Sequence, residues 1–179
     1  MNQVAPTMVL RILELLYQSQ ALKFGSISTE HGVINPYYAD FSRISSGRAL
    51  GLLGDIYAEL IVRNFGSNID AIFGPSYAGI SSCVITADRL SQRLNKDVLF
   101  TFERKVPKPL GDGNMFVGYS YQGGERVIVM DDVIMTGTTT KRSIDCVQAL
   151  GAKVVGVLVG IDREEVVHNN KTARQDIEE

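Results

Sequence analysis

The sequence predicts an α/β fold in which a central parallel sheet is flanked by helices. Short apolar runs that suit buried strands alternate with stretches whose apolar residues recur at helical spacing. The run Val127–Met130 is apolar throughout, as expected of a parallel strand that is covered on both faces. This alternation favours right-handed crossovers. With 179 residues, of which 45% are hydrophobic, the chain is long enough for one well-packed domain and short for two, so we expect residues 1–179 to form a single domain.

Residues 1–45 are expected to form a small unit beside the core. Apolar residues at helical spacing between positions 9 and 16 predict an N-terminal helix whose apolar face packs on the rest of the protein. Residues 22–27 and 36–41 mix apolar and polar side chains around a turn at 30–32, which is typical of a small antiparallel pair.

Residues 46–165 are expected to form the core. Ser45 and Ser46 are good caps for a helix whose apolar face runs through residues 50–61. The remaining predicted elements are a strand at 70–74, a helix at 79–94, strands at 98–102 and 127–130, a helix at 141–150 and a strand at 154–161.

Composition excludes several classes of function. A net charge of -2 argues against a surface that binds nucleic acid. No segment is apolar and long enough to span a bilayer, and no export signal is recognisable, so we expect a cytoplasmic protein with no membrane partner. Its two cysteines, Cys83 and Cys146, are expected to be reduced. The two histidines lie far apart in the sequence, so a histidine-based metal site is not expected.

Two adjacent carboxylates follow the buried run Val127–Met130. Asp131 and Asp132 should emerge at the carboxyl end of that strand, which is the edge where open α/β sheets bind ligands. The turn at 136–140 then offers hydroxyls, backbone N–H groups and the positive end of a following helix to a phosphate. The carboxylates would repel a phosphate, so their partners should be ribose hydroxyls or a divalent cation. A P-loop is excluded because the chain has no Gly-Lys dipeptide.

A basic segment at 104–114 contains Arg104, Lys105 and Lys108 among prolines and glycines. Taken alone, this segment is explained equally well as a solvated, charged loop without a binding role. Beside a phosphosugar site, its cations could close over a diphosphate leaving group and neutralise its charge. The turn at 73–79 could let backbone approach a ligand, or could be a plain tight turn.

These motifs together resemble the orotate phosphoribosyltransferases, a family of type I phosphoribosyltransferases. The resemblance is carried, in order, by residues 21–25, 35–38, 47–54, 73–77, 104–108, 129–134 and 161–163. The Asp-Asp run is shared by many phosphoribosyltransferases, whereas Lys-Phe-Gly at 23–25, Pro-Tyr-Tyr at 36–38 and Asp-Arg at 162–163 favour orotate.

The resemblance implies a type I phosphoribosyltransferase fold in which residues 1–45 form a hood region. It also implies that N1 of orotate displaces diphosphate from 5-phosphoribosyl 1-diphosphate, the donor, to give orotidine 5'-phosphate. Mg²⁺ would be the cofactor, held mainly by the diphosphate and water without a direct protein ligand. The protein would be a homodimer in which the basic loop reaches the neighbouring subunit's site.

The same resemblance assigns residues to this reaction. Catalytic roles fall on Asp131, Asp132 and Lys108. Orotate would be bound by Tyr38, Thr136 and Arg163. The donor would be bound by Lys23, Tyr77, Arg104, Lys105, Lys108, Asp131, Asp132, Val133, Ile134, Met135, Thr136, Gly137, Thr138 and Thr139.

Three positions depart from the family pattern. Ala78 stands where the family usually has lysine, Leu110 where it has histidine and Ala39 where it has a second aromatic residue. The first two changes remove potential contacts to diphosphate. They leave open a non-catalytic regulatory protein that retains the phosphosugar pocket. A transferase for another base is a separate alternative, over which Arg163 and Lys23 favour orotate.

Overall fold

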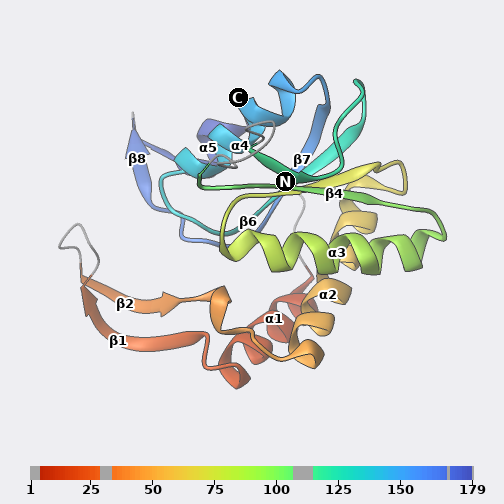
Figure 1. Ribbon diagram of the computed structural model, residues 1–179. Coiled ribbons are helices and arrows are strands. Elements are labelled where there is room, and N and C mark those ends of the chain that lie inside the picture. The colour runs from red at the N-terminus through yellow and green to blue at the C-terminus, as the bar shows by residue number, and fades with distance from the viewer. Residues whose placement is uncertain (1–4, 29–33, 107–114, 169, 179) are drawn as a thin grey trace.

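The computed structural model of the chain describes residues 5–28, 34–106, 115–168 and 170–178, except for the side chains at 28, 78, 167 and 168. A five-stranded sheet with strand order β5-β4-β3-β6-β7 forms its centre (Figure 1). The elements are α1 (Pro6–Gln18), β1 (Leu22–Ser28), β2 (Ile34–Ala39), α2 (Gly47–Phe65), β3 (Ala71–Gly74), α3 (Ala78–Leu94), β4 (Leu99–Glu103), β5 (Phe116–Gly118), β6 (Arg126–Ile134), α4 (Thr138–Ala149), β7 (Lys153–Asp162), β8 (Val166–His168), β9 (Lys171–Thr172) and α5 (Ala173–Ile177).

The predicted α/β fold is confirmed. Strands β3, β4, β6 and β7 pair in parallel, and each predicted core helix is present. Two segments were missed. Strand β5, only three residues long, pairs antiparallel to β4 at the sheet edge, and the polar segment 166–177 forms a small hairpin followed by a helix. Neither segment is long enough to show a clear apolar periodicity.

Strand β6 is longer than predicted. It was expected to end at Met130, with the two acids beyond it, but it continues through both acids to Ile134. The reason is pairing on one side only, because β7 accompanies β6 as far as the Ile134–Asp162 pair whereas β3 stops at the Phe73–Val129 pair. The acids therefore lie past the end of β3 while β7 still holds their backbone.

Side chains of the central strands alternate between two apolar layers. Ile72, Ile128 and Met130 join the cluster formed with α1, α2 and α3. Phe73 and Val129 face the other cluster, which includes Val147 of α4. Figure 1 shows the same division, with α3 on one face of the sheet and α4 on the opposite face. Burial on both faces explains why these strands read as continuous apolar runs.

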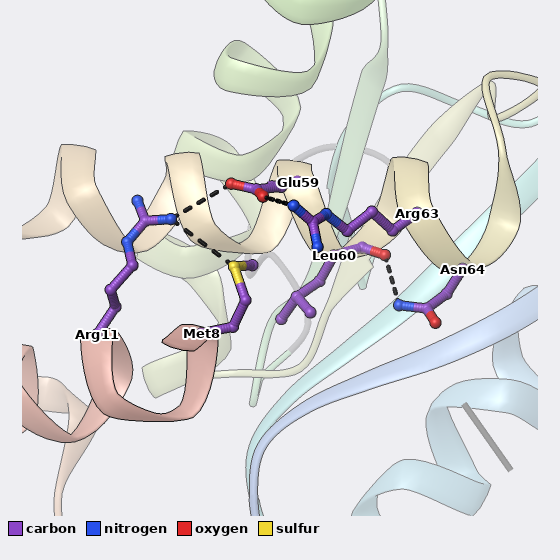
Figure 2. Close-up of polar contacts among 6 residues, drawn as sticks. All are labelled: Met8, Arg11, Glu59, Leu60, Arg63 and Asn64. Carbon is purple, nitrogen blue, oxygen red and sulfur yellow. Dashed lines mark hydrogen bonds and ion pairs between the residues drawn. The ribbon is translucent and has the colours of Figure 1, made fainter. Parts of the chain in front are cut away.

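Helix α1 is attached to α2 by packing and by a polar cluster (Figure 2). Met8 is 3% exposed, and its Sδ accepts a contact from Arg11 Nη1 at 3.7 Å. The same nitrogen donates to Glu59 Oε2 at 3.3 Å, and Glu59 also pairs with Arg63 one turn further along α2. Because these pairs are partly exposed, we expect apolar burial rather than charge to supply most of the binding between the helices.

The hood hairpin, β1 and β2, is the antiparallel pair that the sequence predicted. It extends from the side of the sheet that carries α1 and α2 (Figure 1). Its base is closed by a hydrogen bond of 2.8 Å from Asp40 N to Ala21 O. Lys23 and Tyr38 are direct cross-strand partners, so their side chains share one face of the hairpin.

None of the helices in the described ranges is both long and apolar enough to cross a membrane.

Candidate functional site

The two acids of β6 differ in how freely a ligand can reach them. Asp131 is 8% exposed, and both its oxygens accept hydrogen bonds, Oδ2 from the Thr140 hydroxyl at 2.8 Å and Oδ1 from the Asp132 N–H at 3.0 Å. Asp132 is only half-buried, and its Oδ1 accepts from the Val133 N–H at 2.9 Å. Of the pair, Asp132 presents the more accessible carboxylate.

Burial raises the pKa of Asp131 to about 6. The hydrogen bond from Thr140 opposes this change by stabilising the charged carboxylate, and the nearby charge of Asp132 reinforces it. Two carboxylates side by side thus share a site in which the pKa of one is raised toward neutral pH. A cation or a set of hydroxyl donors at Asp132 would relieve that repulsion.

We expect Asp131→Asn to raise the free energy of unfolding at pH 8 by on the order of 2 kcal/mol and to have little effect at pH 5. Between about pH 4 and 6 the folded protein retains a proton on Asp131 that the unfolded chain has released, so this group favours the folded state at low pH. That contribution is lost as pH rises through about 6. An amide carries no charge to bury, and it can still accept from Asp132 and donate to Thr140.

Urea denaturation of both proteins at pH 5 and pH 8 measures this difference. Asp97→Asn, at an exposed loop position, is the matched control and should change stability equally little at both values. An Asp131→Asn protein that is less stable than the wild type at pH 8 would contradict the prediction.

The turn before α4 has the geometry expected of a phosphate-binding turn. Gly137 has φ of +75°, which favours glycine, and it caps the N-terminus of α4. The hydroxyls of Thr136 and Thr138 lie 3.0 Å apart, and both side chains are exposed. Thr139, in the first turn of α4, is exposed as well. The first N–H groups of a helix have no partner within the helix, and with the positive end of the helix dipole they make this turn suitable for an anion.

Helix α5 packs directly behind that turn. A Cβ built on Gly137 would lie 3.1 Å from Ala173 Cβ and 3.4 Å from Ile177 Cδ1. Lys141, in the second turn of α4, also forms an ion pair with Asp176 of α5. The start of α5 is fixed by a capping box in which Thr172 and Gln175 satisfy each other's backbone N–H groups. The polar segment 171–177 thus contributes to the shape of the turn.

Arg163 lies beside the acid pair Asp131–Asp132 and the turn at 136–140, together called the β6 signature below, because β6 and β7 are paired up to this point. Its N–H donates to Ile134 O at 3.2 Å, directly after the last β6–β7 pair. Its guanidinium donates from Nη2 to Asn35 Oδ1 in the hood, and lies 5.4 Å from the centre of the Tyr37 ring. The aromatic residue under Arg163 is Tyr37, and the predicted contact of Tyr38 with the base stays a prediction.

The described start of the basic loop contacts the turn at 73–79. Lys105 Nζ lies 4.6 Å from the centre of the Tyr77 ring, a cation–π distance. A hydrogen bond of 2.7 Å from Arg104 N to Met115 O closes the base of the loop. The predictions for Lys108 and Leu110 lie outside the described residues.

The glycines of the turn at 73–79 serve packing in this structure. A Cβ on Gly74 would lie 2.6 Å from Gly79 O, and one on Gly79 would lie 2.8 Å from Pro75 Cδ. The side chain at Ala78 is likewise outside the description.

Two concave surfaces lie near the hood hairpin. One, of about 390 Å³, lies between the end of α1 and the start of α2 and includes no predicted site residue. The other, of about 500 Å³, is lined by Tyr17, Gln18, Gln20, Leu22 and the predicted donor ligand Lys23. Tyr38, the partner of Lys23 across the hairpin, is 43% exposed.

Thr140 was expected to offer its hydroxyl to a phosphate with the rest of the turn at 136–140, but it is buried and donates to Asp131 instead. Helical spacing turns it inward, while Thr138 and Thr139 face solvent. Three residues of the site were missed by sequence reasoning, and they are Asn35, Glu165 and Tyr57, whose contacts link distant parts of the chain. The buried Tyr57 hydroxyl has no hydrogen-bond partner among the described residues, and burial raises its pKa.

The described residues do not form a metal site by themselves. In the ranges 5–28, 34–106, 115–168 and 170–178, no group of three or more His, Cys, Asp or Glu side chains could hold a metal ion. A cation at this site would therefore need ligands from the substrate and from water as well as Asp132.

Comparison with known proteins agrees with this geometry. Residues 42–172 match the family model of the phosphoribosyl transferase domain. Orotate phosphoribosyltransferase from Salmonella newport is 38% identical over 168 residues, which cover 94% of this chain and 78% of that protein.

Solved structures agree on the fold. Orotate phosphoribosyltransferase from Francisella tularensis is 31% identical, with a TM-score of 0.74 over 92% of this chain and 78% of that one. The Mycobacterium tuberculosis enzyme in complex with 5-phospho-alpha-D-ribosyl 1-diphosphate has a TM-score of 0.66 over 94% and 89% of the two chains. At 21% identity, that second likeness shows the fold alone.

Proposed function

This chain belongs to the orotate phosphoribosyltransferase family, and on that premise we propose that it transfers the phosphoribosyl group of 5-phosphoribosyl 1-diphosphate to orotate in pyrimidine nucleotide biosynthesis. The products are orotidine 5'-phosphate and diphosphate. One observation carries the proposal. Strand pairing places Arg163, a cation suited to an anionic base, directly beside the acid pair and phosphate turn of β6.

In this proposal the β6 signature binds the phosphoribosyl half of the donor. The turn from Thr136 to Thr139 holds the 5'-phosphate with backbone N–H groups and hydroxyls at the start of α4. The family resemblance also assigns Val133, Ile134 and Met135 to this site. Asp132, the more exposed acid, accepts hydrogen bonds from the ribose hydroxyls, and Asp131 supports it from the buried side.

Departure of the leaving group is assisted by cations of the basic loop. As diphosphate leaves, positive charge develops on the sugar and negative charge on the departing oxygens, so fixed cations near those oxygens lower the barrier. We assign this role to Arg104, Lys105 and Lys108. The contact of Lys105 with Tyr77 supports the assignment, because it brings a loop cation to the turn at which the donor is expected.

Mg²⁺ is the proposed cofactor. The protein ligands available here fit a hard cation that is held mostly by the substrate. Asp132 offers one accessible carboxylate, and the acid pair favours positive charge. When bound, the ion would neutralise the diphosphate oxygens. Asp132 would hold it through water.

Orotate is proposed to bind between Arg163 and the hood. Its carboxylate and carbonyl oxygens are acceptors that suit the planar guanidinium of Arg163. Backbone near Thr136 would complete the polar edge. Tyr37, beneath Arg163, would cover the ring from the hood. Tyr38 and Lys23 share the opposite face of the hairpin, so their proposed contacts with orotate and the donor require that face to turn toward the site.

The wider proposal concerns assembly and location. We propose that residues 1–179 act as one domain within a homodimer, in which the basic loop reaches the partner's site. The free cysteines Cys83 and Cys146 support a location in the cytoplasm. Light scattering that gives the mass of a single chain at assay concentration would refute the dimer.

The activity is tested by following orotate absorbance with the donor, with and without Mg²⁺. We expect consumption of orotate that requires the donor and falls when Mg²⁺ is chelated. Uracil and adenine serve as alternative acceptors. Conversion of either base without orotate consumption would favour a related transferase, and donor binding without any turnover would favour a non-catalytic protein.

A further inference from the structure

A buried amide in the hood contacts the guanidinium that is proposed to read the base. Asn35 is 7% exposed, although Ile34 and Pro36 on either side of it face solvent. Its Oδ1 accepts a hydrogen bond from Arg163 Nη2 across 128 positions of sequence. A buried side-chain amide needs such a partner, because leaving it unpaired costs about 1 to 3 kcal/mol.

Arg163 is held from three sides. Its side chain is only 7% exposed, with Asn35 at Nη2 and the ring of Tyr37 beneath it. Its Nε lies 2.8 Å from Glu165 Oε1, but the N–H has no aligned acceptor, so this contact is an ion pair rather than a directed hydrogen bond. The directed hydrogen bond from the side chain thus goes to Asn35.

The neutral amide matters for the charge of the site. A guanidinium has five N–H donors, so its contacts with Asn35 and Glu165 leave donors for a ligand. Asn35 orients the group without cancelling its charge, whereas a second carboxylate there would compete with an anionic ligand. Glu165 is the one acidic group paired with Arg163 among the described residues. Its side chain is 37% exposed, and screening by solvent weakens its attraction for the guanidinium.

We propose that Asn35 is a positioning residue for recognition of the anionic base. It turns the Arg163 guanidinium toward the site and ties the hood hairpin to the sheet at the point where the base binds. This inference rests on the proposed function, because it takes orotate to be the ligand of Arg163.

Asn35→Asp tests the inference with almost no change of shape. The new carboxylate keeps the hydrogen bond and strengthens the link to Arg163, so we expect the melting temperature to be unchanged or higher. It also neutralises the cation that orotate needs, so we expect the Michaelis constant for orotate to rise about tenfold or more. The dissociation constant of the donor, measured by calorimetry, should change less than about twofold, since the donor is held by the β6 signature.

A control and a second variant distinguish a positioning role of Asn35 from a purely structural one. Asn68→Asp adds the same charge at an exposed loop position and should leave both constants unchanged. Asn35→Ser removes the long amide but adds no charge, and we expect a smaller rise in the orotate constant. A purely structural role would lower the melting temperature of Asn35→Ser without moving that constant.

The outcomes are distinguishable. A wild-type protein that consumes orotate, with folded Asn35→Asp and Asn35→Ser variants whose orotate constants are unchanged, overturns the role of Asn35 alone. A wild-type protein that neither consumes nor binds orotate overturns the proposed function, and this inference with it.

Discussion

Asp132→Asn is expected to lower kcat/KM for the donor by roughly ten- to more than a hundredfold, while the protein remains folded. The amide can still accept from the Val133 N–H, but it cannot offer a full negative charge to ribose hydroxyls and a hydrated cation. Loss of one charged hydrogen bond is typically about 1.5 to 3 kcal/mol, which gives this range of rates.

Steady-state kinetics with varied donor measure the effect, and circular dichroism confirms folding. Asp145→Asn makes the same chemical change at an exposed position of α4 and should leave kcat/KM within about twofold of the wild type. If Asp132→Asn also leaves kcat/KM within about twofold of the wild type, Asp132 does not contact the donor, and the role of the β6 signature must be reassigned.

Gly160→Ala should combine a loss of stability with a loss of activity. A Cβ at this position of β7 would lie 2.4 Å from Phe41 Cζ and 2.7 Å from both Asp132 O and Tyr57 Oη. No rotation of the new methyl group relieves these contacts, so the strand or its neighbours must shift. Overpacking of this kind costs about 1 to 3 kcal/mol, and here the shift acts on the backbone of Asp132 itself.

Urea denaturation and donor kinetics measure the two effects on the same protein. Gly47→Ala is the control, because a Cβ there meets nothing within 4 Å and the residue begins α2. That variant should be neutral or slightly more stable. A Gly160→Ala protein with the stability and kinetics of the wild type would show that the contacts relax without cost.

Local chemistry is what the sequence revealed best. The run Val127–Met130 followed by Asp131 and Asp132 identified both the central strand and the acid pair, because burial and charge are properties of neighbouring residues. The start of α4 was also predictable, since Gly137 and the threonines around it carry the chemistry of a turn and a helix cap.

Contacts between distant segments were not predictable from one sequence. The unequal length of β3 and β7, which places the acids inside β6 rather than beyond it, depends on how three strands align. The choice of Tyr37 over Tyr38 beneath Arg163 depends on which face of the hood hairpin turns toward the sheet. A strand exchanges its two faces with a register shift of one residue, and neither segment alone fixes that register.

The packing of α5 on the phosphate turn has a thermodynamic consequence for how often α5 opens. If the donor binds better when Ala173 supports Gly137 than when α5 is detached, then donor binding and docking of α5 must favour each other by the same free energy. Short segments such as α5 open more readily than the core. The concentration of donor would then set how often α5 detaches, so substrate supply would protect the backbone of residues 171–178 from proteases.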